Sequence, residues 1–338
     1  MTRGAETEVV VVGAGVLGLA TARALAQAGR DVVVCEQFSV GHDRGSSHGA
    51  SRIIRLSYPE ARWVRLAQRS YSLWRELAAE CGQELLSLHG TLDLGDWEAN
   101  RLALEACGEP FEILDAAEIG HRFPIHADGS GLYQRDGGIV HADLALEALR
   151  DGALAAGAEL REGVRVESVD GAGELVVAGD VRAKVAVVTA GAWAPGLVGV
   201  DATPTRETTS YFSGDEPLPS VIDTTTGDVW GYALVAPGIG LKGGLHQSGP
   251  TADPDDPGGT DERIAARTAE WVARRFPGVS APVRTETCLY TTRAGDEFLL
   301  ERRGRVVVGS ACSGHGFKFA PAIGAQLAAL ALEALEGA

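Results

Sequence analysis

The chain has 338 residues, enough for two domains and a large hydrophobic core. It carries 46 Asp and Glu residues against 30 Lys and Arg, a net charge of −16, which argues against nucleic acid or an anionic membrane surface as a partner. Its five cysteines include no CxxC pair, which favours a reducing, cytoplasmic setting, and neither a signal peptide nor an apolar run of transmembrane length is evident.

The first predicted unit runs from Val9 to Glu36 as strand, glycine-rich turn, helix and strand. Val9–Val12 is a β-branched run without polar alternation, typical of a strand buried on both faces of a parallel sheet. Leu and Ala residues then recur at helical spacing, and Gly29 ends the helix. Asp31–Cys35 forms the second strand, which ends on the acidic Glu36.

The turn in this unit has GxGxxG spacing and predicts a dinucleotide site. Its glycines allow a tight turn, close approach of a pyrophosphate and close helix packing, while the helix N-terminus attracts phosphate. The carboxylate of Glu36 can accept hydrogen bonds from ribose. The residues predicted to contact the cofactor here are Gly13, Ala14, Gly15, Val16, Leu17, Gly18, Glu36 and Gln37. The unit leaves NAD and FAD both open, and an ordinary glycine-rich turn is the alternative.

The segment from Gly45 to Tyr58, GSSHGASRIIRLSY, is rich in Gly, Ser and His. It either wraps phosphate or ribityl oxygens or is a surface loop. Beyond it the pattern predicts a helix over 62–80, a strand or hairpin over 85–94, a partly helical stretch over 101–116, a bent strand over 132–140, a helix over 143–156, and strands over 164–169, 174–177 and 185–189.

The C-terminal part begins with a predicted helix over 262–276 and strands over 297–300 and 306–308. The last strand leads to Gly314 and Gly316 and then to an Ala- and Leu-rich helix. This second strand–glycine–helix unit can present N–H groups and a positive helix end to an anionic part of a ligand.

Five segments stand in order along the chain: GAGVLG, GSSHGASRIIRLSY, GLKGGLH, CLYT and SGHGFKF. With them the chain resembles the monomeric sarcosine oxidase family of flavoproteins, which includes N-methyltryptophan oxidase. The resemblance implies an α/β fold, with a Rossmann-like FAD-binding domain interleaved with an α+β substrate domain on a mostly antiparallel sheet. It divides the chain into an FAD domain of residues 1–82, 142–201 and 283–338, and a substrate domain of residues 83–141 and 202–282.

The resemblance also implies roles for single residues. Cys288, which alone would be read as a small buried hydrophobe, would bond covalently to the flavin. Arg55 and Lys318 would hold a substrate carboxylate, although solvated surface charges are the alternative. Lys242 would activate oxygen. Arg52 would lie against the flavin. The residues expected to line the amine pocket are Tyr58, His246, Tyr290 and Trp230. Further expected cofactor contacts are Ser46, Ser47, Val166, Gly314, Gly316, Phe317 and Lys318. We expect no metal, because His246 has no partner at ligand spacing.

The expected activity is that of an FAD-dependent oxidase. A secondary amine bearing a carboxylate, either an N-methyl amino acid or a cyclic imino acid, would become an imine while oxygen becomes hydrogen peroxide. The enzyme would be a monomer whose partners are the small amine and oxygen. The alternatives are an NAD-dependent dehydrogenase and a tailoring flavoprotein for a carrier-tethered or bulky amine. The segment between Asp201 and Cys288 is short for the family, and such a shortening would open the pocket to bulkier substrates.

Overall fold

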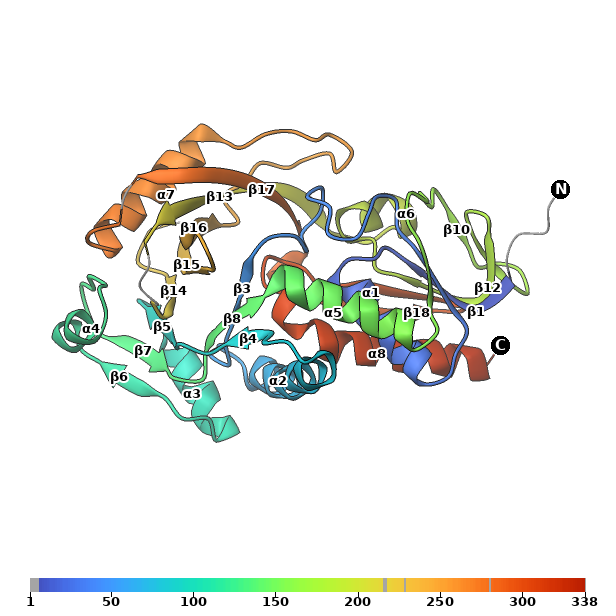
Figure 1. Ribbon diagram of the computed structural model, residues 1–338, viewed down its shortest axis with the longest axis horizontal. Helices are drawn as coiled ribbons and strands as arrows, with labels where there is room; N and C mark the ends of the chain where they lie inside the picture. The colour runs from blue at the N-terminus through green and yellow to red at the C-terminus, as the bar shows by residue number, and fades with distance from the viewer. Residues whose placement is uncertain (1–5, 215–217, 228, 280, 338) are drawn as a thin grey trace.

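The computed structural model describes residues 6–214, 218–227, 229–279 and 281–337. These residues form one region around a parallel sheet and a second around a mostly antiparallel sheet, and the chain crosses between them several times (Figure 1). The predicted fold class is confirmed: a Rossmann-like α/β region is interleaved with an α+β region.

The parallel sheet has the order β19-β12-β1-β2-β9. Its strands are β1 (Glu6–Val12), β2 (Val32–Cys35), β9 (Glu159–Arg161), β12 (Val181–Val188) and β19 (Val306–Ser310). Val9, Val10 and Val11 are fully buried, because both faces of the sheet are covered. Helices pack on one face, and side chains of connecting segments, among them Val164 and Leu197, pack on the other. At the edges β10 (Val169–Asp170), β11 (Val176–Ala178) and β18 (Leu299–Arg303) pair antiparallel.

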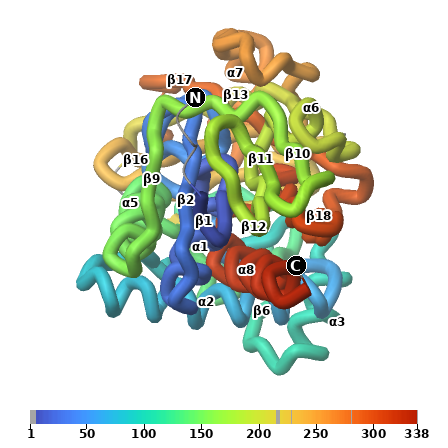
Figure 2. Tube along the Cα trace, turned by 90° about the vertical axis from the view of Figure 1, so that its right-hand side faces the viewer, coloured from blue at the N-terminus to red at the C-terminus, as the bar shows by residue number. Residues whose placement is uncertain are grey.

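Three helices pack on the face of this sheet that carries Val9 and Val11 (Figure 2): α1 (Val16–Gln27), α5 (Ala142–Ala155) and α8 (Ala320–Glu336). The segment Phe317–Glu336 is long and apolar enough to cross a membrane, but half of it is buried in the protein. It packs on α1 and β12, as the core helix of a folded domain does.

The second sheet has the order β17-β13-β16-β15-β14-β5-β7-β6 and is antiparallel except between β14 and β5. Its strands are β5 (Thr91–Leu94), β6 (Glu112–Leu114), β7 (Gly131–Gln134), β13 (Thr203–Ser213), β14 (Ser220–Asp223), β15 (Trp230–Ala236), β16 (Gly240–His246) and β17 (Pro282–Thr292). Helix α7 (Glu262–Arg275) packs Trp271 and Val272 against this sheet and forms a separate core with it.

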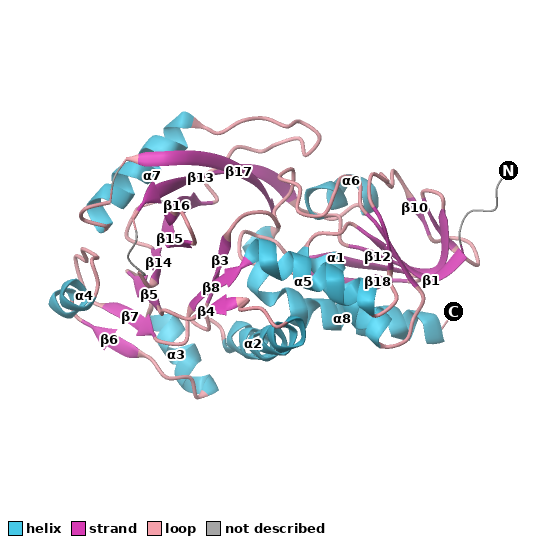
Figure 3. Ribbon diagram, viewed as in Figure 1, coloured by secondary structure: helices cyan, strands magenta, loops and turns pink. Residues whose placement is uncertain are grey.

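A small sheet of β3 (Ser51–Ile54), β8 (Gly138–His141) and β4 (Leu86–Ser87) lies between the two regions. The remaining helices are α2 (Ala61–Cys81), α3 (Glu98–Cys107), α4 (Ala116–Arg122) and α6 (Ala194–Val198) (Figure 3). Short 3₁₀ turns are η1 (Gly191–Trp193), η2 (Ala294–Asp296) and η3 (Phe317–Phe319).

Three predicted strands differ from the structure. The stretch 85–94 is not one strand or a hairpin, because β4 joins the small sheet and β5 the antiparallel sheet. The predicted bent strand over 132–140 is likewise split between β7 and β8, which belong to different sheets. The stretch 164–168 has no ladder. Val164 instead donates its N–H to the Glu36 carbonyl at 2.8 Å, and Val164 and Val166 pack on the face of the parallel sheet that carries Val10.

One predicted domain boundary falls inside a strand. Residue 283 lies in β17, which pairs with β13 along residues 282–292 and therefore belongs to the antiparallel sheet. A boundary drawn from sequence at residue 283 cannot detect this ladder, since its partner lies about eighty residues earlier in the chain.

Candidate active site

The glycine-rich turn joins β1 to α1 at one end of a large cavity. Gly13 has a φ of 97°, and a Cβ there would lie 2.8 Å from the Thr189 carbonyl oxygen. A Cβ at Gly18 would lie 1.9 Å from the Gly13 oxygen, so only glycine lets α1 begin this close to the strand. The predicted residues 13–17 line the cavity. Gly18 is outside the lining, and its contribution is helix packing rather than contact with a ligand.

Glu36 fixes the shape of this turn from the end of β2. Its Oε2 accepts a hydrogen bond from the Ala14 N–H at 2.8 Å and its Oε1 accepts one from the Phe38 N–H at 2.9 Å. The side chain is buried yet lines the cavity together with Gln37. It therefore holds the turn in place and leaves a carboxylate edge beside the α1 N-terminus, as a ribose site requires.

The cavity has a volume of about 940 Å³ and is lined by both sheets. This size and its mixed lining suit a dinucleotide and a small substrate together. The open glycine turn, which any Cβ at Gly13 would obstruct, and the amides at the start of α1 fit the pyrophosphate of FAD. Val166, in the stretch that is not a strand, lines the same cavity.

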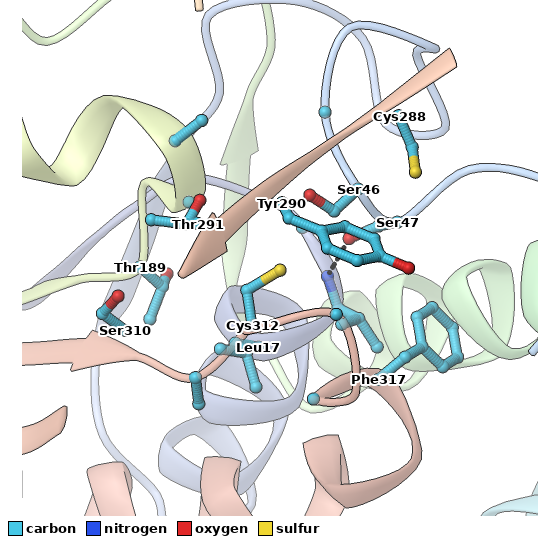
Figure 4. Close-up of a pocket in the computed structure, with 18 of the residues that line it drawn as sticks. Leu17, Ser46, Ser47, Thr189, Cys288, Tyr290, Thr291, Ser310, Cys312 and Phe317 are labelled. Carbon is cyan, nitrogen blue, oxygen red and sulfur yellow. Dashed lines mark hydrogen bonds between the residues drawn. The ribbon is translucent and has the colours of Figure 1, made fainter. Parts of the chain in front are cut away.

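The predicted loop of Ser46 and Ser47 lies against the glycine turn. The Ser47 Oγ accepts a hydrogen bond from the Val16 N–H at 3.1 Å, drawn as a dashed line in Figure 4. Arg52 donates from Nη2 to the Ser46 carbonyl at 2.9 Å and to the His48 carbonyl at 2.6 Å. Its Cζ lies 5.7 Å from the centroid of the Phe317 ring. Arg52 thus shapes the loop, and all four predicted residues line the cavity.

The second glycine turn approaches the cavity from the end of β19. Gly314 has a φ of 75°, and a Cβ there would come within 2.5 Å of the His246 and Tyr290 rings. This close approach explains a glycine at this position. Gly314, Gly316 and Phe317 line the cavity.

Cys288 and Tyr290 lie two residues apart on β17 and so point to the same side of the strand, into the cavity (Figure 4). Burial raises the pKa of the Cys288 thiol to about 11, although Arg52 and Lys242 act in the opposite direction. Cys312 also lines the cavity and points into it (Figure 4). The sequence prediction did not include Cys312, because nothing in its local pattern separates it from a structural cysteine.

A buried polar group made of Arg55, Tyr58 and Lys318 lines another part of the cavity. Lys318 donates from Nζ to the Tyr58 hydroxyl at 2.9 Å and to the His315 carbonyl at 2.8 Å. Burial, and then the charge of Arg55, hold the pKa of Lys318 well below its ordinary value. Within the described part of the chain, Lys318 forms no salt bridge. An unneutralised buried ammonium is costly unless an anion joins it.

Arg55 differs from Lys318 because it has an acidic partner. Its Nη1 lies 3.2 Å from Asp93 Oδ1, and its Cζ lies 4.6 Å from the centroid of the Tyr58 ring. Asp93 is itself buried and accepts hydrogen bonds from Ser57 and Asn100. Asp93 was not predicted as part of the site, since it comes from β5, far from the segment that carries Arg55.

An aromatic wall stands beside these cations. The Trp230 ring stacks on His246 with centroids 5.4 Å apart, and His246 lies 5.6 Å from Tyr290. Burial, Arg55 and Lys318 lower the pKa of His246 to about 4, so the imidazole is neutral at neutral pH. Tyr58 is neutral too, because burial raises its pKa to about 12. All four predicted residues of the amine pocket line the cavity.

Lys242 reaches the cavity from β16. Burial and Arg52 lower the pKa of its ammonium to about 8, against the opposing effect of Glu286. Its Nζ lies 3.2 Å from Glu286 Oε1. Glu286, like Asp93, was missed at the sequence level, because its pairing depends on the β13, β16 and β17 ladders.

Every predicted site residue except Gly18 therefore lines this one cavity. Several unpredicted residues line it as well, among them Trp63, Trp193, His315 and the loop over 252–255. The described residues include no cluster of three His, Cys, Asp or Glu side chains that could hold a metal.

Comparison with known proteins identifies the family. The sequence profile of the family described as "FAD dependent oxidoreductase" matches residues 8–330. The chain belongs to this family. It is 31% identical to "Monomeric sarcosine oxidase" of Streptomyces avermitilis, over 96% of this chain and 93% of the relative. It is 28% identical to "N-methyl-L-tryptophan oxidase" of Yersinia pestis, over 96% and 94% of the two chains.

A solved structure supports the same assignment. NikD, described as "an unusual amino acid oxidase essential for nikkomycin biosynthesis", superimposes with a TM-score of 0.86 at 28% identity, covering 97% of this chain and 94% of that one. The predicted resemblance is confirmed, and the chain is an FAD-dependent oxidoreductase related to sarcosine and N-methyltryptophan oxidases. Membership in this family favours FAD over the NAD alternative.

Proposed function

We propose that this protein oxidises a secondary amine bearing a carboxylate, an N-methyl amino acid or a cyclic imino acid, to an imine, with oxygen as the acceptor and hydrogen peroxide as the second product. The observation that carries the proposal is the buried amino group of Lys318, which has no acidic partner among the described residues and lies in the same cavity as the dinucleotide turn. A substrate carboxylate would supply the missing anion, and Arg55 stands beside it. The names of the sarcosine and N-methyltryptophan oxidase relatives support this substrate class.

When bound, FAD would supply the acceptor for the two electrons and the hydrogen taken from the carbon beside the amine nitrogen. The glycine turn, Glu36 and Gln37 would hold its nucleotide half. Ser46, Ser47 and Arg52, and the second glycine turn with Phe317, would hold the end nearer the substrate.

The protein's own groups favour the reactive form of the amine. Arg55 and Lys318 place two positive charges where the carboxylate binds, and positive charge nearby lowers the pKa of an amine. Tyr58 and His246 are both uncharged at neutral pH, so neither supplies a negative charge that would stabilise the protonated substrate amine. The substrate nitrogen is therefore expected to lose its proton on binding, as the chemistry requires.

Three finer features belong to the proposal. The flavin is bonded to Cys288, whose side chain points into the cavity. The enzyme acts as a monomer in the cytoplasm, which its five unpaired cysteines support. Trp230 is 45% exposed at the aromatic wall, and this leaves room for a side chain larger than that of sarcosine.

Anaerobic titration of the purified yellow protein with free N-methyl and cyclic amino acids tests the activity. We expect at least one acid to bleach the flavin absorbance and its amide to do so far less well, with one peroxide formed per turnover in air. Equal bleaching by acid and amide would contradict carboxylate recognition. Failure of every free amine would leave only a carrier-tethered or otherwise bulky substrate, and so would refute the proposed substrate class.

A further inference from the structure

Lys242 and Glu286 stand between two cavities. Lys242 lines the large cavity and Glu286 does not. Glu286 instead lines a second cavity of about 750 Å³, here called the outer pocket, which Lys242 does not line. The 3.2 Å contact between the Lys242 Nζ and Glu286 Oε1 is therefore a direct polar link between the two spaces.

The outer pocket is polar and reaches the surface. Its lining includes the exposed side chains of Asp143 and Glu147. His48 lines it too and is almost fully buried. Its Nε2 bonds the Thr287 carbonyl at 3.1 Å, but no partner for its buried Nδ1 is found among the described residues. Because exposed residues line the outer pocket, solvent water can enter it and reach Glu286.

The reaction proposed above needs a proton at Lys242. When two electrons and one proton pass from the reduced cofactor to oxygen, hydrogen peroxide forms only if one further proton arrives. An ammonium can give that proton: one N–H bond breaks, one O–H bond forms, and a neutral amine remains. The amine must then be protonated again from solvent, although Lys242 is only 5% exposed.

We propose that Glu286 relays protons from water in the outer pocket to Lys242, and so supplies the proton that oxygen reduction consumes in the large cavity. Glu286 takes a proton from a hydronium ion or a buffer acid and passes it to the neutral amine of Lys242, which restores the carboxylate–ammonium pair. The proposal rests on the proposed function for its acceptor, oxygen, but its geometry does not depend on which amine is oxidised.

The charges around the pair support this cycle. Burial raises the pKa of Glu286, but Lys242, Tyr211 and Arg284 bring it down to about 2. Once Lys242 has given up its proton, it no longer lowers the pKa of Glu286. Burial then raises that pKa. Glu286 therefore gains proton affinity at the moment when Lys242 needs a proton.

The other charged and titratable groups around Lys242 and Glu286 would not deliver protons to Lys242 in place of Glu286. The titratable and charged groups around it are Arg52, His48, Tyr211, Arg284 and Cys288, with Asp143 of α5 beyond Arg284. Burial lowers the pKa of His48 to about 4 and raises that of Cys288 to about 11, so neither changes charge near neutral pH. The guanidinium groups stay protonated.

The test uses flavin-loaded protein reduced with dithionite under anaerobic conditions and mixed with oxygenated buffer. It therefore works even if the amine is misidentified. We expect Glu286→Gln, which keeps the size of the side chain but cannot carry a proton, to slow reoxidation by roughly 10²-fold. Small weak acids such as acetic acid should restore the rate in proportion to their concentration, and the solvent deuterium isotope effect should exceed that of the wild type. The matched control Glu147→Gln removes a carboxylate of the same pocket that does not contact Lys242, and should reoxidise like the wild type.

A second readout does not depend on turnover. The chain has only three lysines, so NMR of protein with ¹⁵N-labelled lysine can follow the titration of Lys242 after its signal is assigned by its loss in Lys242→Met. Glu286→Gln should lower the pKa of Lys242, because Glu286 raises it in the wild type. Reoxidation is then compared at a pH well below the measured pKa in each variant, where Lys242 keeps its charge. An unchanged rate there, or a slow rate without rescue by weak acids, would refute the relay. Loss of amine oxidation with an intact relay would refute only the proposed function.

Discussion

Two buried lysines distinguish this site at the level of single residues. Arginine supplies 27 of the 30 basic side chains, yet two of the three lysines line the cavity. A lysine ammonium is a compact charge with three donors, whereas a guanidinium is a planar fork. Both lysines have pKa values lowered by burial. The chain uses arginine for nearly all its other cations, so the lysines at these two positions are better explained by a function in the cavity.

Substitution of Lys318 by Met should weaken the use of carboxylate substrates. Removal of one of two charge-assisted contacts is expected to cost about 2–4 kcal/mol in kcat/KM. The neutral amide of the same substrate should lose far less, because it never used that charge. Lys184→Met is the control, since Lys184 is half exposed and pairs with Glu8 away from the cavity. An equal loss for acid and amide would show that Lys318 does not bind the carboxylate.

Substitution of Lys242 by Met should act on oxygen rather than on the amine. A fixed positive charge stabilises the anion that forms as oxygen is reduced, and we expect reoxidation to slow roughly 10²–10³-fold. Anaerobic reduction by substrate should change little. In the wild type, reoxidation should weaken as the pH rises through about 8, where Lys242 loses its proton, and the variant should lack this step. Stopped-flow measurement of both half-reactions decides, and equal slowing of the two would contradict the assignment.

Two cysteines face the flavin end, and only one is predicted to bond the cofactor. Acid precipitation of the wild type should leave the yellow colour in the pellet. Cys288→Ala should release it to the supernatant, while Cys312→Ala should not, although both thiols point into the cavity (Figure 4). Because burial keeps Cys288 protonated near neutral pH, attachment to added FAD should become faster at higher pH. Release of the colour by Cys312→Ala alone would overturn the assignment.

At the scale of elements, one loop of the antiparallel region crosses to the cofactor end of the cavity. The carboxylate of Asp255 accepts two hydrogen bonds from Arg165, each of 2.8 Å, and one from the Trp193 Nε1 of 2.8 Å. Its carbonyl accepts one from Arg44. The loop lines the cavity next to Val166 and connects three separate segments of the parallel-sheet region. It closes the end where the nucleotide half of FAD is expected to bind.

Release of FAD should therefore be faster without this loop contact. In the Cys288→Ala background, Asp255→Asn should speed FAD dissociation roughly 2- to 5-fold, since exposed ion pairs contribute about 1 kcal/mol or less. Asp256→Asn is the control, because its carboxylate lies in the same loop but is 3.8 Å from Arg206 and outside the cavity lining. Flavin fluorescence after dilution measures the rate. Identical rates in the two variants would mean that the loop does not retain the cofactor.

The sequence predicts features that depend on local spacing, but not pairings between distant elements. The turn at Gly13 and the acid at Glu36 are set by local spacing, and both are where the pattern predicts them. Glu286 pairs with a cation on another strand and Asp93 with one just beyond the end of β3, so only the tertiary arrangement brings them to the site. The stretch 164–168 has strand-like composition, but it lacks a neighbouring strand to pair with. Local pattern predicted the glycine turn and Glu36, the family resemblance implied most of the remaining cavity residues, and neither predicted the charge partners Asp93 and Glu286.

At the scale of the whole molecule, two cores share one ligand cavity. One core joins the parallel sheet to α1, α5 and α8, and the other joins the antiparallel sheet to α7. The second core holds its own buried ion pair, in which the Arg275 Nε donates to Asp223 at 2.7 Å while Trp271 donates to the same carboxylate at 2.8 Å. The described residues of both regions line the cavity, so a ligand there contacts two separately packed units.

FAD should therefore couple the unfolding of the two regions. In the Cys288→Ala background with FAD bound, we expect a single melting transition whose Tm rises with free FAD, by the equivalent of about 4 kcal/mol at a thousand times Kd. After FAD is removed, two transitions should separate. Asp223→Ala removes the buried acidic partner of Arg275 and leaves it only the exposed Asp128, at a cost of about 3 kcal/mol, and should lower only one of them. Differential scanning calorimetry with and without FAD measures both. A single transition in flavin-free protein, lowered as a whole by Asp223→Ala, would show that contacts between the two regions couple them without the cofactor.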